Sequence, residues 1–184
     1  MGKRIIAQRR GNGSPTYKAH SHRWLADIRY RHFDDIEKNA CIRGTIIDLL
    51  HSRGHSAPVA LIQYETGERY YTLAPEGVRV NDIIECGSTA SVKNGNTLPL
   101  KSIPDGTVIY NIEINPGDGG KLCRVAGASG RVISHFLGET IVELPSKKHK
   151  KLNPFCRATI GVIAGHGRKD KPWVKAGKIH HAMR

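Results

Sequence analysis

The sequence lacks the features of a membrane or secreted protein. No apolar run approaches the roughly 18 residues that a membrane-spanning helix needs, and the apolar patches are short and strand-like. The N-terminal stretch MGKRIIAQRR has no apolar core of the signal-peptide type. Ile6 stands where a myristoylation signal needs serine or threonine. The basic terminal segments also lack the apolar face of a helix that lies on a membrane. We therefore expect a soluble, intracellular protein with no membrane partner.

Cysteine is scarce and widely spaced. The four cysteines, at positions 41, 86, 123 and 156, form no CxxC pair, so the sequence predicts neither a zinc ribbon nor a redox motif. We expect buried, reduced thiols. Close histidine pairs such as His51 and His55 lie in a loop that offers no cysteine or carboxylate to complete a metal site. We expect these histidines to contact solvent or phosphate, and we predict no metal and no other cofactor.

A nucleotide-binding motif is missing where the composition first suggests one. Residues 115–131, NPGDGGKLCRVAGASGR, hold five glycines and three basic residues. A P-loop needs glycine at position 115 and serine or threonine after Gly120-Lys121, but Asn115 and Leu122 stand there. A dinucleotide-binding fingerprint that begins at Gly117 also fails, because its last glycine would fall on Leu122. The stretch is therefore not the loop of a nucleotide enzyme.

Catalytic constellations are absent as well. No Ser-His-Asp or Cys-His arrangement is legible in the sequence. The adjacent carboxylates Asp34 and Asp35 are expected to precede a strand rather than to act as a general acid and base. We predict a protein that is not an enzyme and has no small-molecule substrate.

Acidic residues are few, and the excess of basic residues is segregated. The chain of 184 residues has 29 lysines and arginines against 16 acidic residues, a net charge of +13. Residues 1–32 hold eight basic residues and one acid, and residues 147–184 hold eleven and one. Between them, ten basic and fourteen acidic residues make an ordinary globular composition. Two basic terminal extensions around such a body predict a polyanionic partner, and nucleic acid is the favoured one.

The N-terminal extension, residues 1–35, interleaves arginine with Tyr17, Trp24, Tyr30 and Phe33, while glycine and proline interrupt every periodicity. We expect that this segment cannot build a core and orders only against a partner. Two roles remain open for its rings: they stack on bases, or they pin the extension to the body.

Short strands follow. The runs CIRGTIIDLL, APVALIQY, RYYTLA and DIIECG are rich in β-branched and aromatic residues, and Thr66-Gly67 fits a hairpin loop. Such strands over residues 36–88 suggest a Greek-key barrel of the OB type. Residues 89–164 hold a second series of short strands, one with Val108, Tyr110, Ile112 and Ile114 on one face, as in an SH3-like barrel. Residues 165–184 form a second basic extension, so the predicted fold class is all-β, with two barrels and irregular basic ends.

In this setting the glycine stretch is an irregular loop between strands. Glycines there would let backbone N–H groups approach phosphate closely, and Lys121, Arg124 and Arg131 would supply charge. The alternative is a solvated, basic turn. With basic extensions on both sides, we favour contact with RNA.

Five stretches carry a family resemblance: AQRRG with YKAHSHR, LAPEGVRVND, NGNTLPLKSIPDGTVIYNIE, NPGDGGKLCRVAGASG and FCRATIGVIAGHGRKDKPWVKAG. They are colinear over essentially the whole chain, and together they resemble the large-subunit ribosomal protein two family, in its archaeal and eukaryotic branch. The resemblance implies an OB-fold followed by an SH3-like barrel, with basic extensions between rRNA helices. It also implies a structural protein of the cytoplasmic ribosome that binds large-subunit rRNA early in assembly, contacts neighbouring ribosomal proteins, lies near the peptidyl transferase region and helps to join the subunits.

The resemblance also assigns residues. Those it implies to contact rRNA are Arg79, Lys101, Lys121, Arg124 and Arg157 in the body, Arg9, Arg10, Lys18, His20 and Arg23 before it, and Arg168, Lys169, Lys171 and Lys175 after it. Members of the family continue by several dozen residues where this sequence reads KIHHAMR, so the function of that tail is not carried over, and His180 and His181 do not match its motif. The alternative function is a ribosome-associated translation factor or RNA chaperone, because OB and SH3-like barrels serve there too.

Overall fold

A computed structural model describes residues 2–13, 18, 21–136 and 138–183. Short strands dominate it, with a few single-turn helices between them. In chain order the elements are α1 (Ile6–Gly11), η1 (Ser21–Arg23), α2 (Asp35–Asn39), β1 (Cys41–Leu50), β2 (Val59–Tyr64), β3 (Arg69–Leu73), β4 (Ile83–Gly87), β5 (Thr97–Pro99), η2 (Leu100–Ser102), β6 (Val108–Tyr110), β7 (Gly130–Phe136), β8 (Glu139–Glu143), β9 (His149–Leu152), β10 (Arg157–Ile160), η3 (Arg168–Asp170) and α3 (Ala176–Met183).

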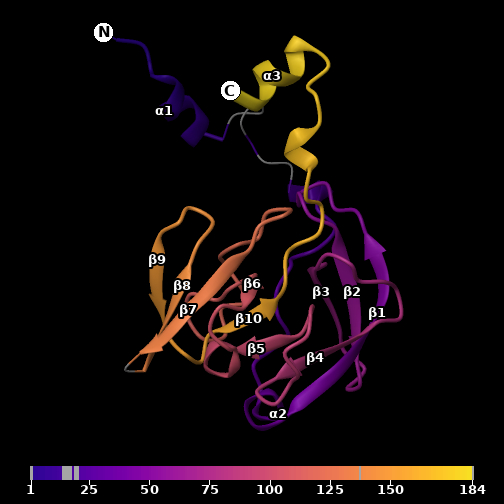
Figure 1. Cartoon of the computed structure of the whole chain (residues 1–184). Coiled ribbons are helices and arrows are strands. Elements are labelled where there is room, and N and C mark those ends of the chain that lie inside the picture. Colours follow the sequence, from indigo (N-terminus) through magenta and orange to yellow (C-terminus); the bar gives the residue numbers. More distant parts are fainter. Residues whose placement is uncertain (1, 14–17, 19–20, 137, 184) are drawn as a thin grey trace.

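Over the described residues, ten strands form one continuous sheet in the order β3-β2-β1-β4-β5-β10-β6-β7-β8-β9. Neighbouring strands are antiparallel except β4 and β5, which meet in parallel through the pair Cys86 and Thr97. Figure 1 shows β1 to β3 on one side of the body and β7 to β9 on the other, with β5 and β10 between them. The all-β prediction is confirmed.

Each half of the sheet buries its own apolar cluster. One cluster gathers side chains of β1, β2 and β4, including Ile46 and Ile62, and the other gathers side chains from Ala90 to Ile160. A third cluster, with Tyr110 and Ile163 against Leu73, joins the two halves. The connection from β4 to β5 spans residues 88–96, and the division into domains at residues 88 and 89 stays a prediction. The assignment of the halves to an OB-fold and an SH3-like barrel stays a prediction.

The strand predicted to carry Val108, Tyr110, Ile112 and Ile114 on one face is wrong in its length and alternation. Strand β6 ends at Tyr110, because Asn111 adopts a left-handed backbone with φ +50°. The chain therefore turns, and Ile109 is fully buried while Val108 is partly exposed. The hairpin at Thr66-Gly67 is confirmed, since Gly67 has φ +85° and Tyr64 N donates to Glu68 O at 2.9 Å.

Strand β9 was not predicted, and it corrects the account of the charge. Lys147 and Lys148 lie in the turn before it, and Lys150 and Lys151 lie in the strand itself. The charge count had placed these lysines in the C-terminal extension, but they belong to the body. Since β9 is an edge of the sheet, its lysines also discourage pairing with another chain.

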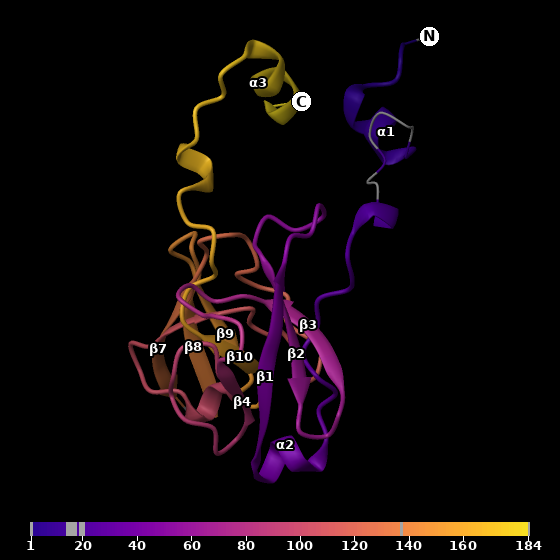
Figure 2. The same cartoon turned by 90° about the vertical axis from the view of Figure 1, so that its right-hand side faces the viewer.

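The N-terminal extension ends earlier than predicted. Ile28, Tyr30 and Arg31 are buried, at 3 %, 6 % and 4 % exposure, so the chain is packed into the body from residue 28 onward. Tyr30 Oη donates to Asn111 O at 2.6 Å and lies 2.7 Å from Thr159 Oγ1. For Tyr30, pinning is therefore the role that the structure supports. Figures 1 and 2 show that the remaining parts of both extensions leave the same end of the body, opposite α2.

Asp34 is the N-cap of α2 rather than a residue that directly precedes a strand. Its Oδ1 accepts a hydrogen bond from Glu37 N at 3.0 Å, which satisfies one of the free N–H groups of the first helical turn. Its Oδ2 accepts a hydrogen bond from Arg31, whose Nε also donates to Glu68 at 2.8 Å. The hydrogen bond from Arg31 lowers the pKa of Asp34 to about 2.

The Asp34→Asn variant should flatten the acid dependence of stability. Asparagine still caps a helix, but it carries no charge for Arg31. A carboxylate whose folded pKa lies below the unfolded value of roughly 3.9 stabilises the fold above that value, and this contribution is lost as the pH falls through the folded pKa. The unmodified protein should therefore lose more free energy of unfolding between about pH 5 and pH 2 than the variant. Urea denaturation across that range measures it, and parallel curves would contradict the assignment.

Candidate nucleic-acid interface

The glycine loop, residues 113–121, is closed at its base by a bridge between Ile112 and Leu122. Its positive-φ glycines allow the tight path, with φ +82° at Gly117 and Gly119 and +87° at Gly120. Glu113 is fully buried, and its carboxylate accepts N–H bonds from Gly117 at 3.2 Å and Gly119 at 3.1 Å. The loop therefore folds around a buried carboxylate.

A second carboxylate occupies the outer part of the loop. Asp118 accepts backbone N–H bonds from Ile114 and Asn115 at 3.2 Å and from Gly120 at 3.3 Å. The sequence had predicted that N–H groups of this loop approach phosphate. That expectation is corrected for Gly117, Gly119 and Gly120, because protein carboxylates already accept their hydrogen bonds.

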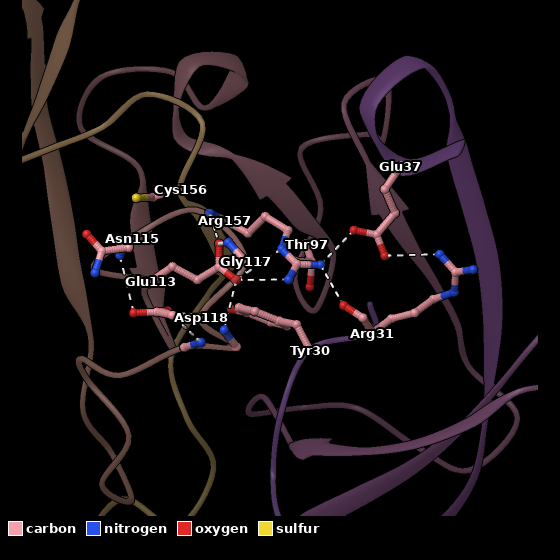
Figure 3. Close-up of polar contacts among 12 residues, drawn as sticks. Tyr30, Arg31, Glu37, Thr97, Glu113, Asn115, Gly117, Asp118, Cys156 and Arg157 are labelled. Atoms are coloured by element: carbon pink, nitrogen blue, oxygen red, sulfur yellow. Dashed lines mark hydrogen bonds and ion pairs between the residues drawn. The ribbon is translucent and has the colours of Figure 1, made fainter. Parts of the chain in front are cut away.

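Arg157 is a second correction. Its side chain is 3 % exposed, so it lies below the surface where RNA would bind. The guanidinium donates to Glu113 at 2.9 Å and 3.1 Å, to Glu37 at 2.7 Å and to Arg31 O at 2.8 Å (Figure 3). Burial lowers its pKa, but the hydrogen bond and charge of Glu113 outweigh burial and raise it overall. Arg157 is thus a buried cross-link between the glycine loop, α2 and the N-terminal segment.

Arg124 ties the loop to the incoming chain. Its Nη1 donates to Gly120 O and its Nη2 to Ile28 O, both at 2.7 Å. Burial lowers the pKa of this half-buried guanidinium. Arg124 therefore fixes the glycine loop against the root of the N-terminal extension, with two of its donors used inside the protein.

Lys121 is exposed at the rim between two hollows. One, of about 650 Å³, is lined by residues 121–128 and by residues 165–168 at the root of the C-terminal extension. The other, of about 340 Å³, is lined by Trp24, His55 and the root of the N-terminal extension. Lys121 and Arg124 line both. The glycine loop thus stands between the points where the two extensions leave the body, and Figure 2 shows both extensions rising from that end.

The second hollow has an aromatic wall that the sequence did not reveal. The rings of Trp24 and His55 lie 5.7 Å apart, and His55 Nδ1 lies 2.9 Å from Ser52 Oγ. Burial and the nearby charge of Arg124 lower the pKa of His55. Arg29, which was also not predicted, is exposed beside it and pairs with Asp27 at 3.1 Å.

The other predicted cations are spread over the molecule. Arg10 and Lys18 are exposed in the N-terminal extension, and Arg168, Lys171 and Lys175 in the C-terminal one. The backbones of Arg9, Arg23 and Lys169 lie in α1, η1 and η3, and His20 lies outside the described residues. Arg79, Lys101 and Arg131 are exposed, but they line neither hollow. The structure therefore gathers Lys121, Arg124 and Arg168 at one end and leaves these three elsewhere.

The described residues contain no group of three or more histidine, cysteine or acidic side chains that could hold a metal ion. None of the helices among them has the length and apolar character of a membrane span. The four cysteines are free, with Cys86 and Cys156 buried and Cys41 and Cys123 half-buried. Burial raises the pKa of Cys123 and of Cys156 to about 11.

Comparison with known protein families shows to which family the chain belongs. Residues 2–86 match the family model "Ribosomal Proteins L2, RNA binding N-terminal domain", and residues 93–184 match "Ribosomal Proteins L2, C-terminal domain". The chain belongs to the ribosomal protein L2 family. The two matches leave a gap where this L2 family member passes from β4 to β5.

Individual relatives agree. This L2 family member is 54 % identical over 183 residues to the large ribosomal subunit protein uL2 of Methanococcus vannielii. It is 52 % identical to that of Methanothermobacter thermautotrophicus and 54 % identical to that of Methanocaldococcus jannaschii, each over 184 residues. The alignments cover 100 % of this chain and 76–77 % of each relative. The predicted family is confirmed, and these relatives belong to its archaeal branch.

Proposed function

We propose that this chain is a structural constituent of the large subunit of the cytoplasmic ribosome and that it binds large-subunit rRNA. The observation that carries the proposal is the match of residues 2–86 to the RNA-binding domain of the L2 family. The relatives that align with the whole length of this chain are each named large ribosomal subunit protein uL2. Exposed cations lie at one end of the body, between the two basic extensions, and they form a surface to which rRNA could bind.

The binding mode follows from the geometry of that end. Folded RNA presents phosphates and shape rather than readable base edges, and Lys121 stands at the rim between two hollows, with the extensions beside it. The extensions would lie between rRNA helices, where their lysines and arginines neutralise phosphate. The proposed contact set at this end is Arg9, Arg10, Lys18, Arg23, Lys121, Arg124, Arg168, Lys169, Lys171 and Lys175. His20, which lies outside the described residues, is proposed from the family resemblance alone. Arg79, Lys101 and Arg131 are proposed as separate contacts with rRNA. Arg157 is not proposed as a contact, because its side chain is buried.

We further infer a role in assembly. A chain with basic extensions that bind several rRNA segments would stabilise the folded RNA, support joining of the subunits and hold neighbouring ribosomal proteins near the peptidyl transferase region. The proposal assigns no catalytic step to any residue of this chain.

Lys121→Ala should weaken rRNA binding in a salt-dependent way. A lysine that neutralises one phosphate releases about one counterion, so its loss should flatten the slope of log affinity against log salt by roughly 0.7 to 0.9. Filter binding of the whole chain to a large-subunit rRNA fragment at several salt concentrations measures the slope.

Arg43→Ala is the matched control for this measurement. Arg43 lies in β1 with its side chain 64 % exposed and 3.7 Å from Glu85, and it lines neither hollow. Its replacement should leave the slope unchanged. Equal slopes for Lys121→Ala and the unmodified protein would remove Lys121 from the contact set, and a slope near zero for the unmodified protein would contradict phosphate binding altogether.

A further inference from the structure

The end of the body opposite the extensions carries a separate cleft. It is a hollow of about 340 Å³ between α2, the turn after β4, η2 and the turn before β10. We call it the α2 cleft, and its lining includes Phe33, Lys38, Asn39, Ser88, Lys101 and Phe155. Figures 1 and 2 place α2 at the end of the body away from α1 and α3. A cleft of this size falls at the small end of the roughly 300–1,000 Å³ of small-ligand sites.

Two rings wall the α2 cleft, and they differ in how they are held. Phe155 is 53 % exposed, and it lines the α2 cleft from the turn before β10. Phe33 is half-buried, and the guanidinium carbon of Arg157 lies 5.0 Å from its ring centroid. The buried cross-link therefore fixes Phe33 in place, while Phe155 offers ring surface to solvent.

Each ring is accompanied by a lysine. Lys101 Nζ lies 4.7 Å from the ring centroid of Phe155 and Lys38 Nζ lies 5.7 Å from that of Phe33. In the described part of the chain, Lys101 has no carboxylate within ion-pair distance, whereas Lys38 pairs with Asp35 on the surface at 2.8 Å. The acid at the floor of the cleft, Glu37, is buried and paired with Arg157. The cleft thus presents a lysine over one face of the Phe155 ring, and about half of that side chain stays open to solvent.

Polar groups complete the lining. Asn39 brings a side-chain amide, which can donate and accept, and Ser88 brings a hydroxyl. Ring surface, cations and a few hydrogen-bonding groups together match an unpaired nucleotide: its base stacks on the ring, its phosphate meets the lysine and its edge meets the polar groups. A duplex cannot enter, because its bases are stacked on one another and its width far exceeds a cleft of this volume.

We propose that the α2 cleft binds an unpaired RNA nucleotide, with its base on Phe155 and its phosphate at Lys101. The inference rests on the proposed rRNA binding and extends it: this chain would grip RNA at both ends of its body, by phosphate neutralisation at the glycine loop and by base stacking at the α2 cleft. The rRNA segment at this end would then contain a bulge or loop with an extruded base.

The test measures binding of the whole chain to a short single-stranded RNA that carries a fluorescent adenine analogue. The same RNA annealed to its complementary strand serves as the duplex for comparison. Phe155→Ala should weaken binding of the single strand about tenfold, because one stacked base is lost, and should reduce the quenching of the analogue. The salt slope should not change with Phe155→Ala, whereas Lys101→Ala should flatten it by about 0.7. Duplex binding should be unaffected by Phe155→Ala.

Phe136→Ala is the matched control, since Phe136 is also a solvent-exposed phenylalanine, at 64 %, and lies at the end of β7 outside the cleft. It should alter neither affinity nor quenching. If Phe155→Ala behaves like Phe136→Ala while the unmodified protein still binds RNA with a steep salt dependence, the α2 cleft is not a base-binding site, and a neighbouring protein becomes its occupant. If the unmodified protein binds neither RNA form, the proposed function itself fails, and the inference with it.

Discussion

Replacing Arg157 with leucine should cost about 3–5 kcal/mol of unfolding free energy, because it leaves buried carboxylates without their partner. Glu37 and Glu113 are both buried at 0 % side-chain exposure, and Arg157 lies 2.7 Å from the first and 2.9 Å from the second. Without Arg157, Glu113 keeps only backbone N–H donors, and Glu37 keeps only Arg31, whose Nη1 lies 3.4 Å from it. A loss of this size is a large part of the roughly 5–15 kcal/mol that stabilises a typical domain.

Urea denaturation of Arg157→Leu and of Arg29→Leu compares the loss of a buried arginine with the loss of an exposed one. Arg29 pairs with Asp27 at 3.1 Å, but the two side chains are 70 % and 77 % exposed, so its loss should cost less than about 1 kcal/mol. Adding Glu37→Gln and Glu113→Gln to Arg157→Leu should recover part of the stability, since the stranded charges are then removed. A deficit below that of Arg29→Leu, or no recovery, would contradict the account of the network.

Gly120→Ala should destabilise the glycine loop by about 2–5 kcal/mol, from two sources. Gly120 has φ +87°, a left-handed conformation that costs an alanine about 1–2 kcal/mol. A Cβ there would also lie 2.4 Å from Asn111 Oδ1 and 2.8 Å from Asn111 O, and overpacking of this kind adds about 1–3 kcal/mol. Because the loop carries Lys121, the variant should weaken RNA binding as well.

Gly117→Ala is the control that isolates the steric part. Gly117 has φ +82°, nearly the same conformation, but a Cβ there meets nothing within 4 Å. Its cost should therefore be the backbone strain alone, and thermal or urea denaturation of both variants gives the difference. Equal losses at the two positions would mean that Asn111 yields to a new Cβ and that the loop is less closely packed than described.

The strands could be predicted because their signal is local. The runs CIRGTIIDLL and DIIECG, rich in β-branched residues, correspond to β1 and β4, and Thr66-Gly67 corresponds to the hairpin between β2 and β3. The glycine stretch likewise revealed a loop of left-handed glycines. The tight turn at Asn111 was not predicted, because an asparagine within an apolar run looks like any other polar residue of an alternating strand.

The contacts of the site could not be predicted, because they join residues far apart in the chain. Arg157 meets Glu37 across a separation of 120 residues, and no local pattern shows that this arginine is buried rather than exposed. The same holds for the carboxylates of Glu113 and Asp118, which take the glycine N–H groups that phosphate was expected to take. Lys121 was correctly singled out as a basic residue of the loop, and its contact with RNA stays a proposal.

The central claim, that this chain is a structural protein of the large ribosomal subunit, is tested most directly by sedimentation. A cell extract is run on a sucrose gradient before and after a high-salt wash, and the fractions are probed for this chain. A structural protein should sediment with the large subunit at one copy per particle and withstand the wash, because the proposed contact set would hold it to many phosphates at once. A chain that stays near the top of the gradient, or that the wash removes, would contradict this account and favour a translation factor or RNA chaperone that only visits the ribosome.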